Sequence, residues 1–76
     1  MTQANTKIGR KLRFLRVNYR GKACVGLTQV QLAKRAGLHP NCVNRIESGA
    51  VEQPLAITLA RLADALGVEV EQLESP

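Results

Sequence analysis

One short segment, residues 40–48, carries the side chains with the most specific hydrogen-bonding chemistry. Asn41 and Asn44 each offer a donor and an acceptor, and Arg45 offers two parallel donors. These patterns complement the N6/N7 edge of adenine and the O6/N7 edge of guanine. On a helix, at 100° per residue, one side of this segment would hold Pro40, Asn41, Asn44, Arg45 and Ser48. The other side would be mainly apolar, so an element that buries it would present the polar side.

Residue types that bind metals or catalyse reactions are sparse. Cys24, Cys42 and His39 supply three potential zinc ligands where a structural site needs four, and the cysteines lack C-x-x-C spacing. Glu47 is the one acid in residues 1–48, so no second carboxylate lies near it in sequence for acid–base catalysis. We therefore expect no metal, no cofactor and no enzymatic activity, with His39 capping a helix and Cys42 packing in a core.

Charge is divided unevenly along the chain. The 76 residues contain 11 Lys/Arg and 6 Asp/Glu, for a formal net charge of +5 and a pI of about 9.9. Residues 1–48 hold ten basic groups and one acid, whereas residues 49–76 hold one basic group and five acids. Residues 1–48 are therefore expected to face a polyanion, and residues 49–76 are expected to face away from it. The alternative is a helical protein whose basic residues line solvated faces.

Length and composition bound the class of protein. A chain of 76 residues makes a single domain with a small core, which leaves no room for a deep active site. With only 3% aromatic residues and many leucines and alanines, helices are favoured over a β-sandwich. The polar N-terminus has no signal-peptide pattern, no apolar run reaches membrane-span length, and two isolated cysteines suit a reducing compartment. We expect a soluble cytoplasmic protein that does not bind membranes.

Two apolar stripes predict amphipathic helices near the two ends of the chain. In residues 8–19, apolar side chains recur at i, i+4, i+7 and i+11. The same spacing recurs in residues 55–66, where Pro54 opens the helix and Gly67 ends it. A last segment, residues 70–74, would add one or two turns.

Two further helices are bounded by capping residues. Thr28 and Gln31 have the spacing of a capping box, which starts a helix that ends at Gly37. After a short turn, Pro40 stands where its fixed φ suits the first position of another helix, with His39 as the N-cap. This helix carries the polar side described above.

Two helices joined by a tight turn are the parts of a helix-turn-helix. The stretch LTQVQLAKRAGLHPNCVNRIESG, followed by P-x4-L-A-R-L-A-D-A-L-G-V and preceded by IGRKLRFLR, resembles the Cro-like and lambda-repressor-like (XRE-type) DNA-binding domains. The resemblance covers most of residues 8–73. It implies an all-α fold, a compact four- to five-helix domain spanning residues 1–76. In that domain residues 1–6 form a flexible arm and the helix-turn-helix lies at about residues 28–48.

The resemblance also implies site residues. Pro40, Asn41 and Arg45 match the positions that face bases in the major groove, with Asn44 beside them; Pro40 has no donor, so its contact would be apolar. The positions expected at the DNA backbone are Thr28, Gln29, His39, Arg16, Lys34, Arg35 and Ser48. The alternative for Thr28 is that it only caps the helix. The alternative for the basic residues is that they lie on a solvated face without contacting DNA. Glu47 matches an acid that pairs with a basic residue of the first helix, here Lys11.

Two departures from the family pattern stand out. Ten residues separate Arg16 from Leu27 where many relatives have about four, so the first helix is longer or a basic loop with Arg20 and Lys22 follows it. The loop after Gly49 reads Ala-Val-Glu where relatives often place a basic residue, which weakens the expectation of a backbone contact there.

The function implied is sequence-specific regulation of transcription through double-stranded DNA. One reading helix spans few base pairs, so we expect a homodimer on a palindromic operator, with half-sites roughly 34 Å apart. Apolar residues that could form the dimer interface are Val51, Ile57, Val68, Val70 and Leu73. The alternative is an antitoxin that neutralises a protein toxin and regulates its own operon. Binding to anionic membranes through the basic first helix is a weaker alternative.

Overall fold

The computed structural model describes residues 7–21 and 25–74. Its helices are α1 (Lys7–Val17), α2 (Gln29–Ala36), α3 (Pro40–Ser48), α4 (Ala56–Leu66) and α5 (Val70–Glu74). Within the described ranges the one β-type pairing is an isolated antiparallel bridge between Arg20 and Val25. The expectation of an all-α domain of four to five helices is therefore confirmed, with five helices in the described residues. The N-terminal arm, Lys22 and Cys24 lie outside the described residues.

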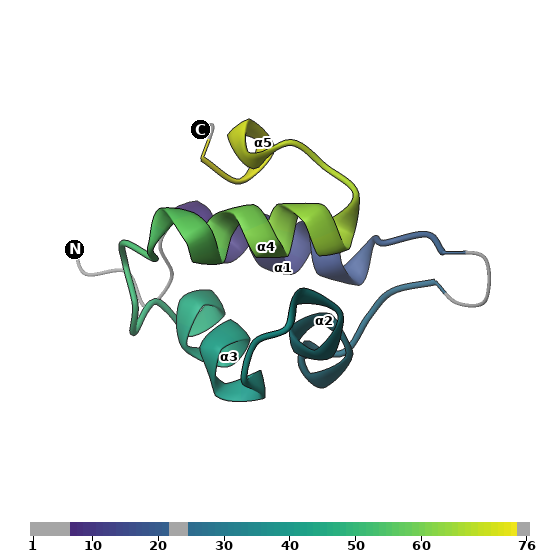
Figure 1. Ribbon diagram of the computed structural model, residues 1–76, viewed down its shortest axis with the longest axis horizontal. Helices are drawn as coiled ribbons and strands as arrows, with labels where there is room; N and C mark the ends of the chain where they lie inside the picture. Colours follow the sequence, from purple (N-terminus) through teal and green to yellow (C-terminus); the bar gives the residue numbers. More distant parts are fainter. Residues whose placement is uncertain (1–6, 22–24, 75–76) are drawn as a thin grey trace.

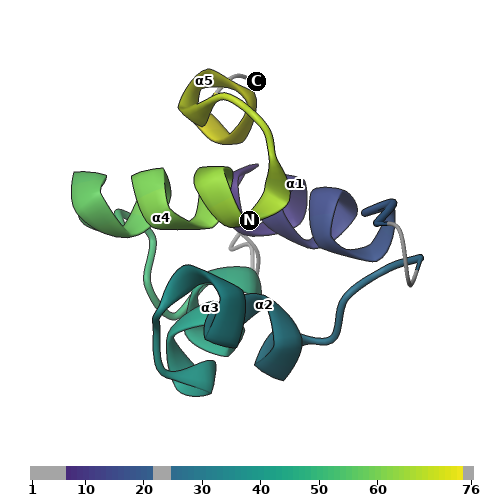
Figure 2. The same ribbon diagram turned by 45° about the vertical axis from the view of Figure 1, so that its right-hand side comes forward.

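The helices are arranged around α4 (Figure 1). Helices α1 and α4 lie next to each other across the middle, α2 and α3 lie together on one side, and α5 covers the opposite side (Figures 1 and 2). Helix α2 packs on both α3 and α4, whereas α5 packs on α4 and α1. The helix pair α2–α3 thus stands on a platform of α1 and α4 and leaves its outer surface free.

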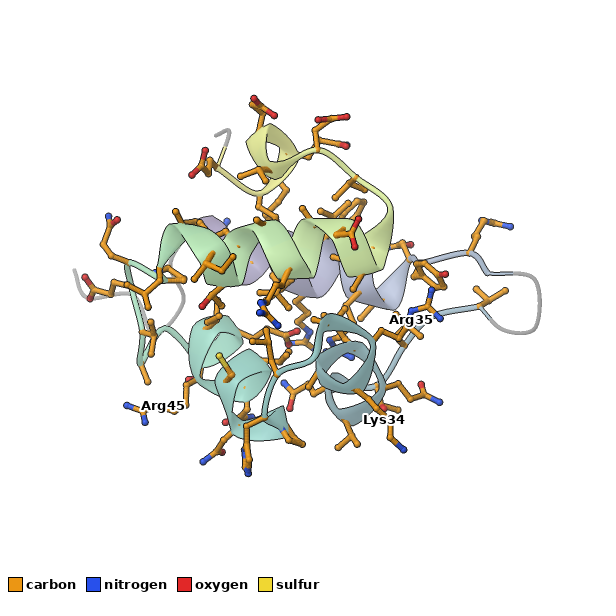
Figure 3. The ribbon with its side chains drawn as sticks, in the orientation of Figure 1. Lys34, Arg35 and Arg45 are labelled. Atoms are coloured by element: carbon orange, nitrogen blue, oxygen red, sulfur yellow. The ribbon has the colours of Figure 1, made fainter. Side chains whose placement is uncertain are left out.

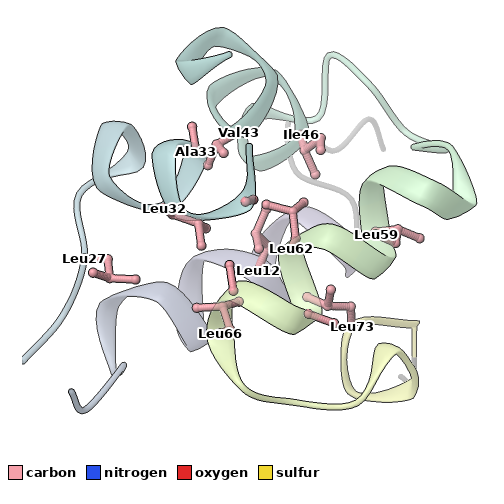
Figure 4. Packing of buried hydrophobic residues seen from close by; sticks show 13 residues of the cluster. Leu12, Leu27, Leu32, Ala33, Val43, Ile46, Leu59, Leu62, Leu66 and Leu73 are labelled. Atoms are coloured by element: carbon pink, nitrogen blue, oxygen red, sulfur yellow. The ribbon is translucent and has the colours of Figure 1, made fainter. Parts of the chain in front are cut away.

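The core is one cluster of aliphatic side chains contributed by all five helices (Figure 4). Its largest fully buried members are Leu12, Leu32, Val43, Ile46, Leu62 and Leu73. The buried positions of α4, from Leu59 to Leu66, follow the predicted helical stripe. Leu55 departs from that stripe because it precedes the helix and is 71% exposed.

Local capping signals are confirmed in α2 and α3. The Thr28 hydroxyl accepts from the Gln31 amide, and the Gln31 side chain in turn accepts from the Thr28 amide, completing the capping box. Gly37 takes a left-handed conformation with φ of 72° and ends α2. His39 Nδ1 accepts from the Asn41 amide at 3.1 Å and so caps α3. Each cap satisfies helix-end groups that water or DNA would otherwise have to satisfy.

Two predicted boundaries were wrong. Helix α4 begins at Ala56 rather than at Pro54, with Leu55 as an N-cap that lacks a side-chain hydrogen bond. Helix α1 ends at Val17, so Tyr19 lies beyond it although it still packs on the core. The extra residues do not lengthen α1: the chain turns back, and the Leu27 amide donates to the Arg16 carbonyl at 3.0 Å.

Candidate nucleic-acid interface

The outer side of α3 is polar and uncovered. Pro40, Asn41, Asn44, Arg45 and Ser48 are all exposed, whereas Val43, Ile46 and Glu47 of the same helix are buried. The core therefore holds α3 by its buried side and leaves the five exposed residues in solvent. We call these five residues the reading side of α3. Figure 3 shows Arg45 extending from α3 away from the helix bundle. This placement agrees with the face predicted from helical periodicity.

The tight turn fixes α3 against α2. The Leu38 amide donates to the Ala33 carbonyl at 2.8 Å, immediately after the left-handed Gly37. The positive φ of Gly37 favours glycine, and an added Cβ would meet only the end of the exposed Arg61 side chain, 3.2 Å from Nη1. The direction of α3 is thus set by a short, hydrogen-bonded connection.

A buried ion pair joins α1 to α3. Arg16 Nε donates to Glu47 Oε2 at 2.6 Å, and Arg16 Nη2 donates to Glu47 Oε1 at 3.0 Å. The third nitrogen, Nη1, donates to the Leu27 carbonyl at 2.7 Å. The side chains are only 13% and 5% exposed. The prediction that Lys11 pairs with Glu47 was therefore wrong, because the packing of α1 on α3 brings Arg16 to Glu47.

The same ion pair alters the expectation for Arg16. All three nitrogens of its guanidinium donate to protein acceptors, and the group is largely buried. These bonds use three of the five N–H groups of the guanidinium, and Arg16 also lines the pocket that Arg10 and Arg13 border. Arg16 therefore has a structural role in this fold, and its contact with the DNA backbone stays a prediction.

Gln29 is also engaged. Its Nε2 donates to Glu47 Oε1 at 3.0 Å, and its Oε1 accepts from Asn44 Nδ2 at 3.1 Å. The carboxamide therefore bridges the buried acid and a residue of the reading side of α3. Its position at the start of α2 still places main-chain N–H groups at the positive end of the helix dipole.

The remaining residues expected at the DNA backbone differ in how free they are. Lys34 is exposed and extends outward from α2, beside the reading side (Figure 3). Arg35 points toward Tyr19, donates to its hydroxyl at 2.8 Å and lies 5.1 Å from its ring centroid. The Ser48 hydroxyl donates to the Arg45 carbonyl at 3.2 Å. Lys34 is thus the freer of the two α2 cations.

Two arginines that the sequence reasoning did not single out border the same surface. Arg10 and Arg13 are exposed on α1 and line a pocket of about 250 Å³ that also includes Gln29, Asn44 and Ser48. The i, i+3 spacing of these arginines on a basic helix was the available signal, but the sequence did not reveal which part of α1 faces α3.

The opposite flank of α3 is also hollowed. A pocket of about 400 Å³ lies there, and its lining includes Asn41, Cys42 and Arg45. The reading side of α3 is therefore bordered by a depression on each flank.

The residues expected at a dimer interface fall into three groups. Leu73 is completely buried in the core, so it is unavailable for a partner and that expectation was wrong. Val51, Val68 and Val70 are half-buried and pack against the core. Ile57 is 59% exposed.

Features of other classes of site are absent from the described part of the chain. In residues 7–21 and 25–74, no group of three or more His, Cys, Asp or Glu side chains is arranged to hold a metal ion. Within the same ranges, no helix has the length and apolar character needed to cross a membrane.

Comparison with known proteins relates this geometry to a family. A family model described as Helix-turn-helix matches residues 25–73. The restriction-modification controller protein C.AhdI from Aeromonas hydrophila, known from a crystal structure, is 33% identical in sequence to this chain. The two structures align with a TM-score of 0.76 over 88% of this chain and 91% of C.AhdI. A hypothetical transcription factor, NHTF from Neisseria, is 30% identical with a TM-score of 0.71, over 88% of this chain and 67% of that chain.

No curated protein matches the chain. The family model nevertheless spans more than half of the sequence, and both solved structures align over most of it. The chain belongs to the XRE-type helix-turn-helix family, and it is a DNA-binding transcription regulator rather than an enzyme.

Proposed function

We propose that the protein recognises a specific operator by placing α3 in the major groove. The observation that carries this proposal is the division of α3 into a buried side and an uncovered side of carboxamide and guanidinium groups. Asn41 and Asn44 suit adenine, Arg45 suits guanine, and Pro40 can contact a thymine methyl group. Each well-formed bidentate pair would discriminate by about 1–3 kcal/mol.

Backbone contacts would fix the register of α3 in the groove. Arg10 and Arg13 border α3 on the α1 side, and Lys34 extends from α2. The N-terminus of α2 offers the main-chain N–H of Gln29 to a phosphate; the Thr28 amide is bonded to Gln31, so Thr28 would contribute its hydroxyl. Such contacts hold the protein on DNA without reading sequence. His39 and Ser48, at the two ends of α3, remain proposed backbone contacts, as do Arg35 and Arg16.

A homodimer on a palindromic site completes the proposal. One α3 reads only a few base pairs, so two copies on half-sites about 34 Å apart would be needed for useful specificity. The acidic segment after Gly49 lies away from the basic reading surface in sequence, and Ile57 and Leu55 are its large exposed apolar side chains. We place the interface on this segment, with Val51, Val68 and Val70 contributing their exposed parts.

The alignment with C.AhdI also favours one biological setting. It covers 91% of that controller protein, so this chain matches almost its whole length and not just a shared motif. We infer that the chain acts as a controller of gene expression in a restriction-modification system.

Selection of bound sequences from a random duplex pool tests operator recognition. Wild type is compared at physiological salt with Asn41→Ala/Arg45→Ala and with the control Arg61→Ala, an exposed arginine on α4. We expect a palindromic consensus from wild type and the control, and its loss in the double variant. A wild type that enriches no consensus would contradict sequence-specific binding.

A further inference from the structure

Four side chains form a continuous chain of hydrogen bonds from the core to the reading side of α3. Arg16 donates to Glu47, Gln29 donates to Glu47 at 3.0 Å, and Asn44 donates to Gln29 at 3.1 Å. The residues come from α1, α3 and the start of α2. We name these four residues, Arg16, Glu47, Gln29 and Asn44, the polarity relay.

The direction of every bond in the polarity relay follows from its buried end. The Glu47 carboxylate, 5% exposed and paired with Arg16, offers only acceptor oxygens. Gln29 must therefore turn its NH₂ group toward Glu47, which leaves its oxygen facing Asn44. Asn44 must then turn its NH₂ group toward Gln29. Oxygen and nitrogen of a carboxamide are otherwise interchangeable in shape, so the ion pair determines the orientation.

The orientation determines what Asn44 offers to a ligand. Asn44 is exposed, and one of its two Nδ2 hydrogens is used by Gln29. Its Oδ1 accepts no hydrogen bond from the described residues, so Oδ1 and the second N–H are both available to a ligand. An oxygen acceptor beside one donor matches adenine, whose N6 donates and N7 accepts. Cytosine N4 can donate to the Asn44 oxygen, although cytosine offers no acceptor to the second N–H. Guanine O6 and thymine O4 are acceptors and therefore repel the Asn44 oxygen.

We propose that Gln29 is a positioning residue that holds the Asn44 carboxamide in one of its two orientations, so that Asn44 selects a base with an exocyclic amino group. The inference rests on the proposed operator recognition. It gives Gln29 a role different from the phosphate contact expected from sequence. Without Gln29 the Asn44 carboxamide turns freely and accepts keto and amino bases with smaller discrimination.

The variant Gln29→Met tests the proposal, because methionine has a similar length and can neither donate to Glu47 nor accept from Asn44. The matched control is Val30→Met, which places the same residue at the next, 57% exposed position of α2. Thermal unfolding followed by circular dichroism verifies that both variants fold. Each protein is then titrated against the selected operator and against versions with each base pair at the position nearest Asn44.

Wild type and Val30→Met should prefer amino over keto bases at that position by roughly tenfold in Kd, within the range for one good side-chain–base pair. In Gln29→Met the preference should fall to about twofold, with discrimination at the Asn41 and Arg45 positions unchanged. An equal loss of affinity for all versions would overturn the proposal and make Gln29 a phosphate contact alone.

A second measurement uses the free protein. In wild type, nuclear magnetic resonance should show slowed solvent exchange for one of the two side-chain amide hydrogens of Asn44, and Gln29→Met should remove the difference. Equal exchange in wild type would refute the relay whatever the DNA result. If wild type shows slowed exchange yet has no base preference anywhere, the proposed function fails. If it reads bases elsewhere but is indifferent at the Asn44 position, this inference alone fails.

Discussion

Breaking the ion pair between Arg16 and Glu47 by removing one partner should cost a large part of the stability of so small a domain. Replacing Arg16 with methionine removes three hydrogen bonds, two of them to the carboxylate, and leaves Glu47 at 5% exposure without its cation. Breaking a buried pair by removing one partner costs about 3–5 kcal/mol. Because the Arg16 side chain keeps 13% exposure, water can reach the site and the lower value, about 3 kcal/mol, is expected.

That loss is large against the total stability. A domain of 76 residues is stable by about 4–11 kcal/mol at the usual 0.05–0.15 kcal/mol per residue. Urea unfolding followed by circular dichroism measures the free energy of unfolding of Arg16→Met. The control is Arg13→Met, an exposed arginine on the same helix, for which a change within about 0.5 kcal/mol is expected.

A double variant separates the ion pair from the hydrophobic alternative. In Arg16→Met/Glu47→Leu no charge is left buried, and apolar replacements of buried pairs are often neutral or stabilising. We expect the double variant to recover most of the stability lost in Arg16→Met. A loss below about 1 kcal/mol in Arg16→Met, or a double variant no more stable than the single, would refute the reasoning.

Two further predictions concern the core and the electrostatic footprint. Leu62→Ala removes a fully buried side chain at the centre of α4 and should lower the free energy of unfolding by about 2–5 kcal/mol, measured by urea unfolding; a change near zero would show that the site collapses or is solvated. Arg10→Ala/Arg13→Ala should weaken binding to all duplexes alike and reduce the slope of log K against log salt by about 0.9 for each phosphate that the variant no longer neutralises. A salt dependence equal to that of wild type would exclude these arginines from the backbone interface.

The helices of the reading unit could be predicted because their determinants are local. The capping box joins Thr28 and Gln31, which are three positions apart, and the left-handed Gly37 and the N-cap His39 act within one turn. The polar side of α3 follows from helical periodicity alone. These features depend on neighbours in sequence, so the fold class and the residues that face outward from α3 could be stated without coordinates.

Boundaries that depend on competition between local and tertiary preferences were less accurate. Pro54 is compatible with a helix start, yet α4 begins two residues later and leaves Leu55 exposed. The apolar spacing that includes Tyr19 is helical, yet the chain turns back after Val17 and Tyr19 instead meets Arg35. Leu73 was expected at a surface, but α5 folds over α1 and α4 and buries it.

By itself, the sequence determined the reading helix, its outward side and the basic character of the surface around it. Only the tertiary structure decided which basic residue of α1 meets Glu47, because that depends on how α1 is rotated against α3 across 31 residues of chain. It also decided that Gln29 and Asn44, 15 residues apart, share a hydrogen bond. Capping and periodicity arise from bonds between near neighbours, whereas these pairings exist only after the core has fixed the positions of three helices.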